Sequence, residues 1–391
     1  MRLDGILQDL EARREKVING GWNCLPLPFP RYRNLLPGTE QGRYIIVSAN
    51  QKVGKSKLCD YLWVYELVFF AVEHPDFKAK VLYFTLEMSP KEKYNEFLCH
   101  LLMRLDGIYL TTTDLKSTDR DKPIDPHIFE LLRSDRYRIY IEKYEELIEY
   151  IDDQKNPTGI NKYCRGYAEA NGHYNYVEIK NVNKQTGEVE RRTILDPINP
   201  FTWDNPDMYV FVLLDNASNL FTEKGMDLRE TINKMSKYFI TLKSQLNMIT
   251  VLIQHQAQDK EGNESFKLGR IKPSSDGLAD CKSTSRDADL VIGLYSPFKY
   301  GLSDYEGYDI KKFKNYIRFM EVLEDRHYGA AGNICPLFFN GASSTFNELP
   351  LPDNSMEIEK VYRYIRTLEE QKFKKAVKSF FIYVKQLFKR R

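Results

Sequence analysis

The sequence predicts an α/β fold in which a mainly parallel central sheet is flanked by helices. Short apolar runs typical of buried strands alternate along the chain with stretches of helical periodicity. The runs are residues 44–47, 81–85, 137–142, 208–215 and 248–254. Ser89 and Pro90 follow the second run as a helix cap and a first helical residue. Alternation of this kind is typical of a parallel sheet.

The chain divides into three segments that differ in their sequence patterns. Residues 1–36 form an N-terminal amphipathic helix, ended by Gly20 and Gly21, and a proline-rich lead-in. Residues 37–350 form the α/β domain. Within it, residues 172–206 alternate like strands around a Thr186-Gly187 turn, so we expect an inserted β-hairpin, either with a specific role or as a plain surface elaboration. Residues 351–391 form a linker and a basic C-terminal helix.

Composition excludes several classes of protein. The chain has 391 residues, 42% of them hydrophobic and 29% charged, as expected of a globular protein. A net charge of +2 gives no global attraction to nucleic acid, so any such binding must be local. The six cysteines form no CxxC pair, which argues against a zinc ribbon. Without a signal peptide or a long apolar span, we expect a cytoplasmic protein.

An octapeptide between the first predicted strand and the following helix has the form [AG]-x-x-x-x-G-K-S. Its residues are Ala49, Asn50, Gln51, Lys52, Val53, Gly54, Lys55 and Ser56. In such a P-loop, backbone N–H groups wrap the phosphates of ATP, the lysine reaches the outer phosphates and the serine hydroxyl binds Mg²⁺. A Gly-Lys turn without a nucleotide is the alternative, but the strand and helix on either side favour the P-loop.

Asp215 ends the apolar strand 208–215. A single aspartate at this position is usually a cap or a turn residue. Together with the P-loop, however, it is the expected acid that holds Mg²⁺ at the carboxyl edge of the sheet.

The segment Tyr83-Phe84-Thr85-Leu86-Glu87-Met88-Ser89 resembles the F-S-L-E-M-S motif of DnaB-like replicative helicases, which are RecA-like P-loop NTPases. The resemblance implies that Glu87 polarises the attacking water, a role that suits a carboxylate beside a γ-phosphate. Ala49 also fits that family, whose P-loop commonly begins with alanine.

Further motifs extend the resemblance over about residues 20–350. Residues 251–254 are similar to the strand whose glutamine senses the γ-phosphate, which implies that role for Gln254, and residues 276–289 are similar to a further family segment. Residues 324–329 and 339–341 resemble the ending of the RecA-like domain, which implies that Arg326 is an arginine finger completing a neighbour's ATP site. The resemblance therefore implies a homo-oligomer, expected to be a hexameric ring.

The chain departs from the family in three respects. We expect the chain to lack the family's N-terminal primase-binding domain, Glu324 replaces a lysine two residues before the finger, and the hairpin has no usual counterpart. We expect the first helix to serve as a linker helix that docks on an adjacent subunit. Glu324 removes a positive charge from the shared site, which predicts slow hydrolysis.

Basic residues in the loop after the sensor strand are candidates for gripping single-stranded DNA through its phosphates. They are Lys260, Lys267, Arg270, Lys272 and Lys282. An ordinary solvated loop is the alternative. Residues 371–391 carry eight basic residues and no acid, which suits DNA, an acidic partner or a solvated helix face. His255 and His327 lack metal-ligand spacing and are interpreted as polar neighbours of the site.

These features predict an ATP- and Mg²⁺-dependent, ring-forming DNA helicase of the DnaB type, active in replication and served by a loader or another replication protein. The main alternative is a RecA-like ATPase that binds DNA or remodels a partner without unwinding, such as a recombinase, loader or clock-type ATPase. A structural protein with a degenerate nucleotide site is a third reading. The intact set of Lys55, Ser56, Glu87, Asp215 and Gln254 argues against the third.

Overall fold

The computed structural model describes residues 3–182, 189–257 and 271–371, and it confirms the predicted fold class. A nine-stranded sheet has the order β17-β16-β15-β12-β3-β11-β10-β4-β5. From β12 to β5 the neighbouring strands pair in parallel, while β15, β16 and β17 are antiparallel. The bounds, in sheet order from β17, are Thr345–Glu348, Ile334–Asn340, Ile317–Asp325, Leu290–Tyr295, Tyr44–Ala49, Ile249–His255, Tyr209–Asp215, Ala79–Thr85 and Ile148–Ile151.

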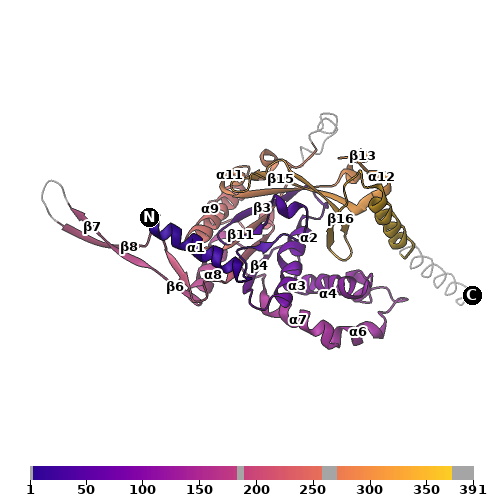
Figure 1. Ribbon diagram of the computed structural model, residues 1–391, viewed down its shortest axis with the longest axis horizontal. Coiled ribbons are helices and arrows are strands. Elements are labelled where there is room, and N and C mark those ends of the chain that lie inside the picture. The colour runs from indigo at the N-terminus through magenta and orange to yellow at the C-terminus, as the bar shows by residue number, and fades with distance from the viewer. Residues whose placement is uncertain (1–2, 183–188, 258–270, 372–391) are drawn as a thin grey trace, which may run out of the picture.

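Helices cover both faces of the parallel strands, which makes three layers (Figure 1). On one face lie α2 (Lys55–Asp60), α3 (Glu66–Glu73), α4 (Pro90–Asp106) and α7 (Asp135–Leu147). On the other lie α8 (Pro157–Glu169) and α9 (Leu228–Leu246). Because the central strands are covered on both faces, they are apolar throughout rather than alternating.

The residues of β3 illustrate how one strand serves two cores. Ile45 and Val47 pack with α2 and α3, whereas Tyr44 and Ile46 pack with α9. Successive side chains of a strand point to opposite faces, so each core takes alternate residues. At the helix that follows β4, the Ser89 side chain accepts a hydrogen bond from the backbone N–H of Glu92, as the sequence predicts.

One strand prediction is wrong. Residues 137–142 lie inside helix α7, and the edge strand of the parallel sheet is instead β5, which has four residues. Tyr137 and Tyr144 are seven residues apart on the buried side of α7, which is a helical spacing. The aromatic and β-branched residues of this segment favoured a strand by composition, but packing against α3 and β4 decides in favour of the helix.

The antiparallel end of the sheet has a separate small core. Phe313, Tyr316 and Phe338 pack there with Ile358 and Leu368, which belong to a helix at residues 355–371. This helix lies at the yellow end of the ribbon (Figure 1). Of the basic tail predicted at residues 371–391, all but the first residue lies outside the described residues.

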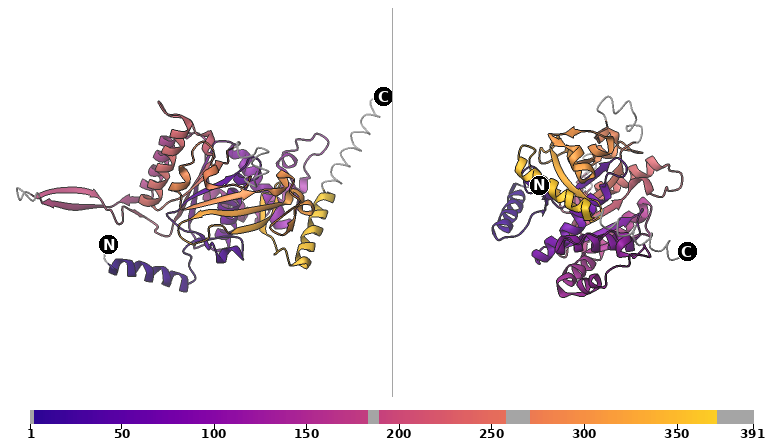
Figure 2. Two further views of the ribbon diagram at one scale, coloured as in Figure 1. Left: turned by 90° about the horizontal axis from the view of Figure 1, so that it is seen from above. Right: turned by 90° about the vertical axis from the view of Figure 1, so that its right-hand side faces the viewer.

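Two elements lie at the periphery. The predicted hairpin is formed by β7 (Tyr176–Val182) and β8 (Val189–Leu195), and it projects from the body in both Figure 1 and Figure 2; its predicted turn is outside the described residues. Helix α1 (Leu3–Ile18) is attached to the body through the pair Lys16–Asp207, with 2.5 Å between Nζ and Oδ1, and the pair Arg13–Glu40, with 2.9 Å between Nη2 and Oε2. Its Leu3 and Leu10 side chains are exposed.

All six cysteines are free thiols. Within the described ranges, every helix is too short or too polar to cross a membrane.

Candidate nucleotide site

The predicted phosphate loop lies between the end of β3 at Ala49 and the start of α2 at Lys55. Lys52 and Gly54 in this loop have positive φ, 60° and 108°. A Cβ added to Gly54 would lie only 3.1 Å from Cζ of Phe339, so both conformation and space favour glycine there. A loop of this shape at a helix start directs backbone N–H groups toward an anion.

The 3₁₀ turn at residues 297–300 supports the first half of the loop. Lys299 donates a hydrogen bond from Nζ to the carbonyl oxygen of Gln51, with 3.0 Å between the atoms. The side-chain amide of Asn50 donates to the hydroxyl of Tyr300. Asn50 is buried, so its amide is engaged in holding the loop.

A buried arginine supports the second half. Arg318 on β15 donates from Nε to the carbonyl oxygen of Val53 at 2.7 Å, and its Nη1 donates to the backbone carbonyl oxygens of Asn315 and Ile317. Its guanidinium carbon lies 4.5 Å from the centre of the Phe339 ring. Burial lowers the pKa of Arg318 to about 9.

Parallel pairing brings the predicted acids together. Asp215 is paired in register with Thr85, two residues before Glu87. Ser56 Oγ donates to Asp215 Oδ1 at 2.9 Å, and Asn216 Nδ2 donates to Glu87 Oε2 at 2.8 Å. The P-loop helix, β4 and β10 thus place the hydroxyl and two carboxylates at one edge of the sheet.

Lys55 lies in the same field of charges. It is 7% exposed, and burial lowers the pKa of its amine, while the carboxylates of Asp215 and Glu87 oppose that shift. A buried ammonium near two carboxylates is suited to meet the phosphate charges of a nucleotide.

The structure turns the Gln254 side chain toward the segment after it. Nε2 donates to the carbonyl oxygens of Ala279 (2.6 Å) and Cys281 (2.9 Å), and Oε1 accepts from the hydroxyl of Thr284 (2.8 Å). Gln254 has no exposed surface. Its amide therefore positions residues 279–284 in this structure, and its sensing role stays a prediction.

The next residue, His255, faces the site instead. It pairs in register with Ala49 at the start of the P-loop. Burial lowers the pKa of His255, and the Lys55 ammonium lowers it further, against the opposing carboxylates of Glu87 and Asp215. Because side chains alternate along a strand, His255 lies on the α2 side and Gln254 on the α9 side.

A buried charged group behind Asp215 escaped prediction from the sequence. Lys93 Nζ lies 2.8 Å from Asp60 Oδ2, 2.8 Å from the Tyr83 hydroxyl and 3.3 Å from Asp215 Oδ2. Burial alone would lower the pKa of Lys93, but the Asp60 and Asp215 carboxylates outweigh it and raise that pKa. The helical spacing of Lys93 with the buried Phe97 and His100 could have revealed it as an inward-facing cation.

The donors at the edge of the sheet fit Mg²⁺. Ser56 and Asp215 supply a hydroxyl and a carboxylate oxygen that already lie in contact, and hard oxygen ligands are what Mg²⁺ prefers. Mg²⁺ at phosphate-transfer sites takes few protein ligands, with water and phosphate oxygens completing its shell. Among the residues that the structure describes, no group of three or more His, Cys, Asp or Glu residues is arranged to hold a metal ion.

Arg326 lies at the opposite end of the central strands from the P-loop. β15 is antiparallel to β12, so its end at Asp325 pairs with Leu290, which itself pairs with Ile45 near the start of β3. The P-loop follows the opposite end of that strand, about 17 Å away, because a strand of six residues has five steps of about 3.3 Å each. Arg326 is exposed, and its guanidinium donates to the carbonyl oxygen of Arg286. Arg326 is therefore remote from the P-loop of its own chain.

The predicted DNA contacts are only partly described. Three lie outside the described residues, namely Lys260, Lys267 and Arg270. Of the others, Lys272 Nζ lies 5.0 Å from the centre of the Tyr305 ring, and Lys282 is exposed. The two described lysines thus differ in exposure, because Lys272 is half-buried and Lys282 is exposed. Of the two predicted polar neighbours, His327 lies at the Arg326 edge, 3.6 Å from Asp289.

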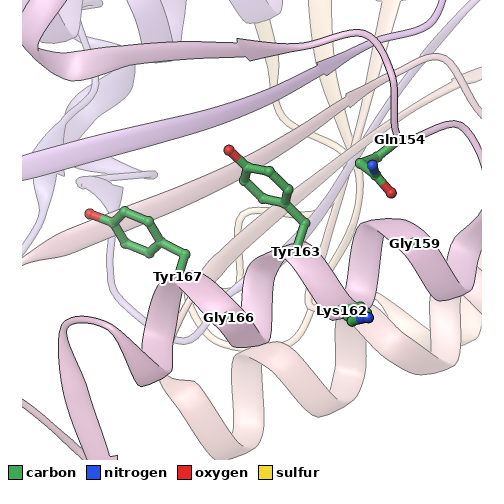
Figure 3. Close-up of a pocket in the computed structure, with 6 residues that line it drawn as sticks. All are labelled: Gln154, Gly159, Lys162, Tyr163, Gly166 and Tyr167. Atoms are coloured by element: carbon green, nitrogen blue, oxygen red, sulfur yellow. The ribbon is translucent and has the colours of Figure 1, made fainter.

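A surface groove of about 490 Å³ lies along α8, remote in sequence from every predicted site residue. Tyr163 and Tyr167 rise side by side from this helix, Tyr163 between Gly159 and Gly166 and Tyr167 just beyond Gly166 (Figure 3). The Tyr163 hydroxyl donates to Glu149. The groove contains no residue of the P-loop and is separate from the nucleotide site.

A parallel sheet with this strand order, a P-loop after β3 and an acid at the end of β10 defines the RecA-like P-loop NTPase fold. The fold is similar to that of a DnaB-like replicative helicase whose structure was described together with its interactions with primase. The TM-score is 0.59 and the sequence identity is 14%, and the match covers 89% of this chain and 67% of the helicase. The fold is shared equally with a second solved structure, that of an ATPase domain: TM-score 0.58 and 14% identity, covering 89% and 99%. No protein-family model and no curated protein matches the sequence.

Proposed function

We propose that the chain is an ATPase that forms a ring and translocates on single-stranded DNA as a helicase of the DnaB type. The observation that carries the proposal is the joining of Ser56 to Asp215 and of Glu87 to Asn216 at the edge of the sheet where Lys55 also lies. A protein that only bound nucleotide would have no need of a carboxylate like Glu87 beside the γ-phosphate.

In this proposal the residues divide the work of phosphoryl transfer. The P-loop N–H groups and Lys55 bind the β- and γ-phosphates of ATP, and Glu87 accepts a proton from the attacking water. Ser56 and Asp215 would hold Mg²⁺, which neutralises charge on the phosphates when it is bound. On β11, His255 is better oriented than Gln254 to contact the terminal phosphate, because it lies on the α2 side beside Ala49, whereas the Gln254 amide is bonded to Ala279 and Cys281.

The proposal of an oligomer rests on the position of Arg326. Since this residue lies at the sheet edge opposite its own P-loop, it serves as a finger only for a neighbouring subunit. Head-to-tail repetition of such a contact closes into a ring, here proposed as a hexamer, or continues as a filament. Lys282 and the basic residues before it would face the central channel and track DNA phosphates. We place the protein in the cytoplasm, where a replication loader would be a further partner.

A RecA-like ATPase that does not unwind DNA is the second candidate, and Glu324 favours it. This exposed carboxylate lies two residues before Arg326, where it would weaken the positive field offered to a neighbour's phosphates. Slow hydrolysis without strand separation is the outcome that this candidate predicts.

Unwinding of a forked duplex, measured together with ATP hydrolysis, tests the proposal. Wild-type protein should do both, Lys55→Ala should lose nucleotide binding, and Glu87→Gln should bind ATP but hydrolyse it about 10²- to 10⁴-fold more slowly. Hydrolysis without unwinding would establish the second candidate. A wild-type protein that binds but never hydrolyses ATP would overturn both.

A further inference from the structure

Lys93 is a lysine with no exposed surface, and it is placed between two carboxylates that are each 1% exposed. Its Nζ contacts Asp60 through both carboxylate oxygens, at 2.8 and 3.1 Å, and Asp215 through Oδ2, at 3.3 Å. The Tyr83 hydroxyl bridges the same two acids, at 2.9 Å from Asp60 and 3.3 Å from Asp215. We refer to Lys93, Asp60 and Tyr83 as the buried network.

The network joins the elements that carry Ser56, Glu87 and Asp215 of the proposed ATP site. Asp60 lies on α2, one helical turn beyond Ser56. Tyr83 lies on β4, which leads to Glu87, and Lys93 lies on α4, which begins directly after that segment. Asp215, which both Lys93 and Tyr83 contact, is the last residue of β10.

The two oxygens of Asp215 have different partners. Oδ2 is held from behind by Lys93 and Tyr83, and Oδ1 accepts the hydrogen bond from Ser56. A carboxylate fixed through one oxygen cannot rotate freely, so the network determines where Oδ1 points. Groups that orient a ligand in this way commonly change metal affinity by 10- to 100-fold when they are removed.

Stability alone is a poor explanation for the network. Taking two carboxylates and an ammonium out of water is costly, and buried ion pairs seldom stabilise a protein more than apolar residues of the same shape would. The helices α2 and α4 are also joined by a second pair, in which Lys57 Nζ lies 2.7 Å from Glu96 Oε1 without contact to Asp215. The feature peculiar to Lys93 is its contact with the acid of the nucleotide site.

We propose that Lys93, Asp60 and Tyr83 are positioning residues that hold Asp215 toward Ser56 and thereby set the affinity of the nucleotide site for Mg²⁺. The inference rests on the proposed function, because it concerns the same site.

The test is a Mg²⁺ titration of fluorescent ATP-analogue binding, which needs no hydrolysis. The double variant Lys93→Met/Asp60→Asn removes one charge of each sign, so the net charge around Asp215 is kept and its support is lost. The half-saturating Mg²⁺ concentration should rise about tenfold. Binding of the analogue in EDTA should stay unchanged, since the P-loop is intact.

Lys57→Met is the matched control, because it cuts the other link between the same two helices and should leave the Mg²⁺ dependence unchanged. Tyr83→Phe keeps the charges and removes one hydroxyl, so it should shift the Mg²⁺ dependence in the same direction by less. Tyr83→Phe also tests the inference if the double variant does not fold. A wild-type Mg²⁺ dependence in the folded double variant, or in Tyr83→Phe if the double variant is unfolded, would overturn the inference alone. A wild-type protein that binds no nucleotide would overturn the proposed function as well.

Discussion

Asn216 donates a hydrogen bond from its side-chain amide to the carboxylate of Glu87, at 2.8 Å. The two residues lie 129 positions apart and meet because β10 and β4 are neighbouring parallel strands that end together. Glu87 is exposed, whereas Asn216 is 2% exposed and is fixed by its position at the end of β10. The amide therefore gives an otherwise free side chain a defined direction.

Replacement of Asn216 should slow hydrolysis without weakening ATP binding. Asn216→Ala removes the donor, so Glu87 loses its fixed orientation and kcat should fall about tenfold, by roughly 1.4 kcal/mol of transition-state stabilisation, with little change in KM. Steady-state ATPase kinetics measure both constants.

Asn216→Asp separates this effect from a local structural one. Asn216 Oδ1 also accepts a hydrogen bond from the backbone N–H of Ser218, which an aspartate would preserve. The aspartate has no N–H to give and would repel Glu87, so kcat should fall at least as far as in Asn216→Ala. Wild-type kcat in Asn216→Asp would mean that only the hydrogen bond from Ser218 matters.

Mixing two inactive variants should restore ATPase activity if Arg326 acts on a neighbouring subunit. In a 1:1 mixture of Arg326→Ala and Lys55→Ala, about one quarter of randomly formed head-to-tail interfaces combine an intact Lys55 with an intact Arg326. Activity should rise above that of either variant alone.

Lys55→Ala mixed with Glu87→Gln is the matched control. Both residues belong to the same side of an interface, so no mixed interface contains an intact pair and activity should stay low. Equal recovery in the two mixtures would rule out a shared site of the proposed kind.

Much of the fold and the local motifs could be predicted because they depend on short stretches of sequence. The P-loop, the cap at Ser89 and the apolar strand before Asp215 each carry their pattern within about ten residues. The strand placed at residues 137–142 failed because a short apolar run does not distinguish a strand from a buried helix turn.

Contacts between distant residues were beyond such reasoning. Lys93 meets Asp60 and Asp215, which lie 33 and 122 positions away, only through the packing of two helices on the sheet. The choice between Gln254 and His255 likewise depends on which face of β11 each side chain takes. A slip of one residue in strand register exchanges the two faces, and the sequence alone leaves that register open.

Arg318 should influence nucleotide affinity through the shape of the P-loop. Its guanidinium donates to the Val53 carbonyl and to two carbonyls near its own strand, a geometry that lysine cannot reproduce. Both Arg318→Met and Arg318→Lys should weaken ATP binding about tenfold, or by roughly 1.4 kcal/mol.

Equilibrium binding of a fluorescent ATP analogue measures this effect, and the lysine variant is the informative one. If Arg318 acted only as a positive charge near the phosphates, Arg318→Lys would bind like the wild type. Weakened binding in both variants supports a role in holding the loop.

His100 should make the protein less stable below neutral pH. It has no exposed surface, its Nδ1 lies 2.9 Å from the carbonyl oxygen of Ser343, and its ring stacks on Tyr65 with 4.6 Å between centres. Burial lowers the pKa of His100 from 6.5 to about 4. Between these values the unfolded chain takes up a proton that the folded protein does not, so the free energy of unfolding falls as the pH falls.

The expected loss from His100 is roughly 2 kcal/mol between pH 8 and pH 5, since about 1.5 pKa units separate pH 5 from the ordinary histidine value. Urea unfolding of wild type and His100→Gln at both pH values isolates it. At pH 8 the difference between the two proteins reports packing alone, because the histidine is neutral in both states. At pH 5 the difference should shift by about 2 kcal/mol in favour of the variant, and a constant difference would show that His100 is protonated in the folded protein.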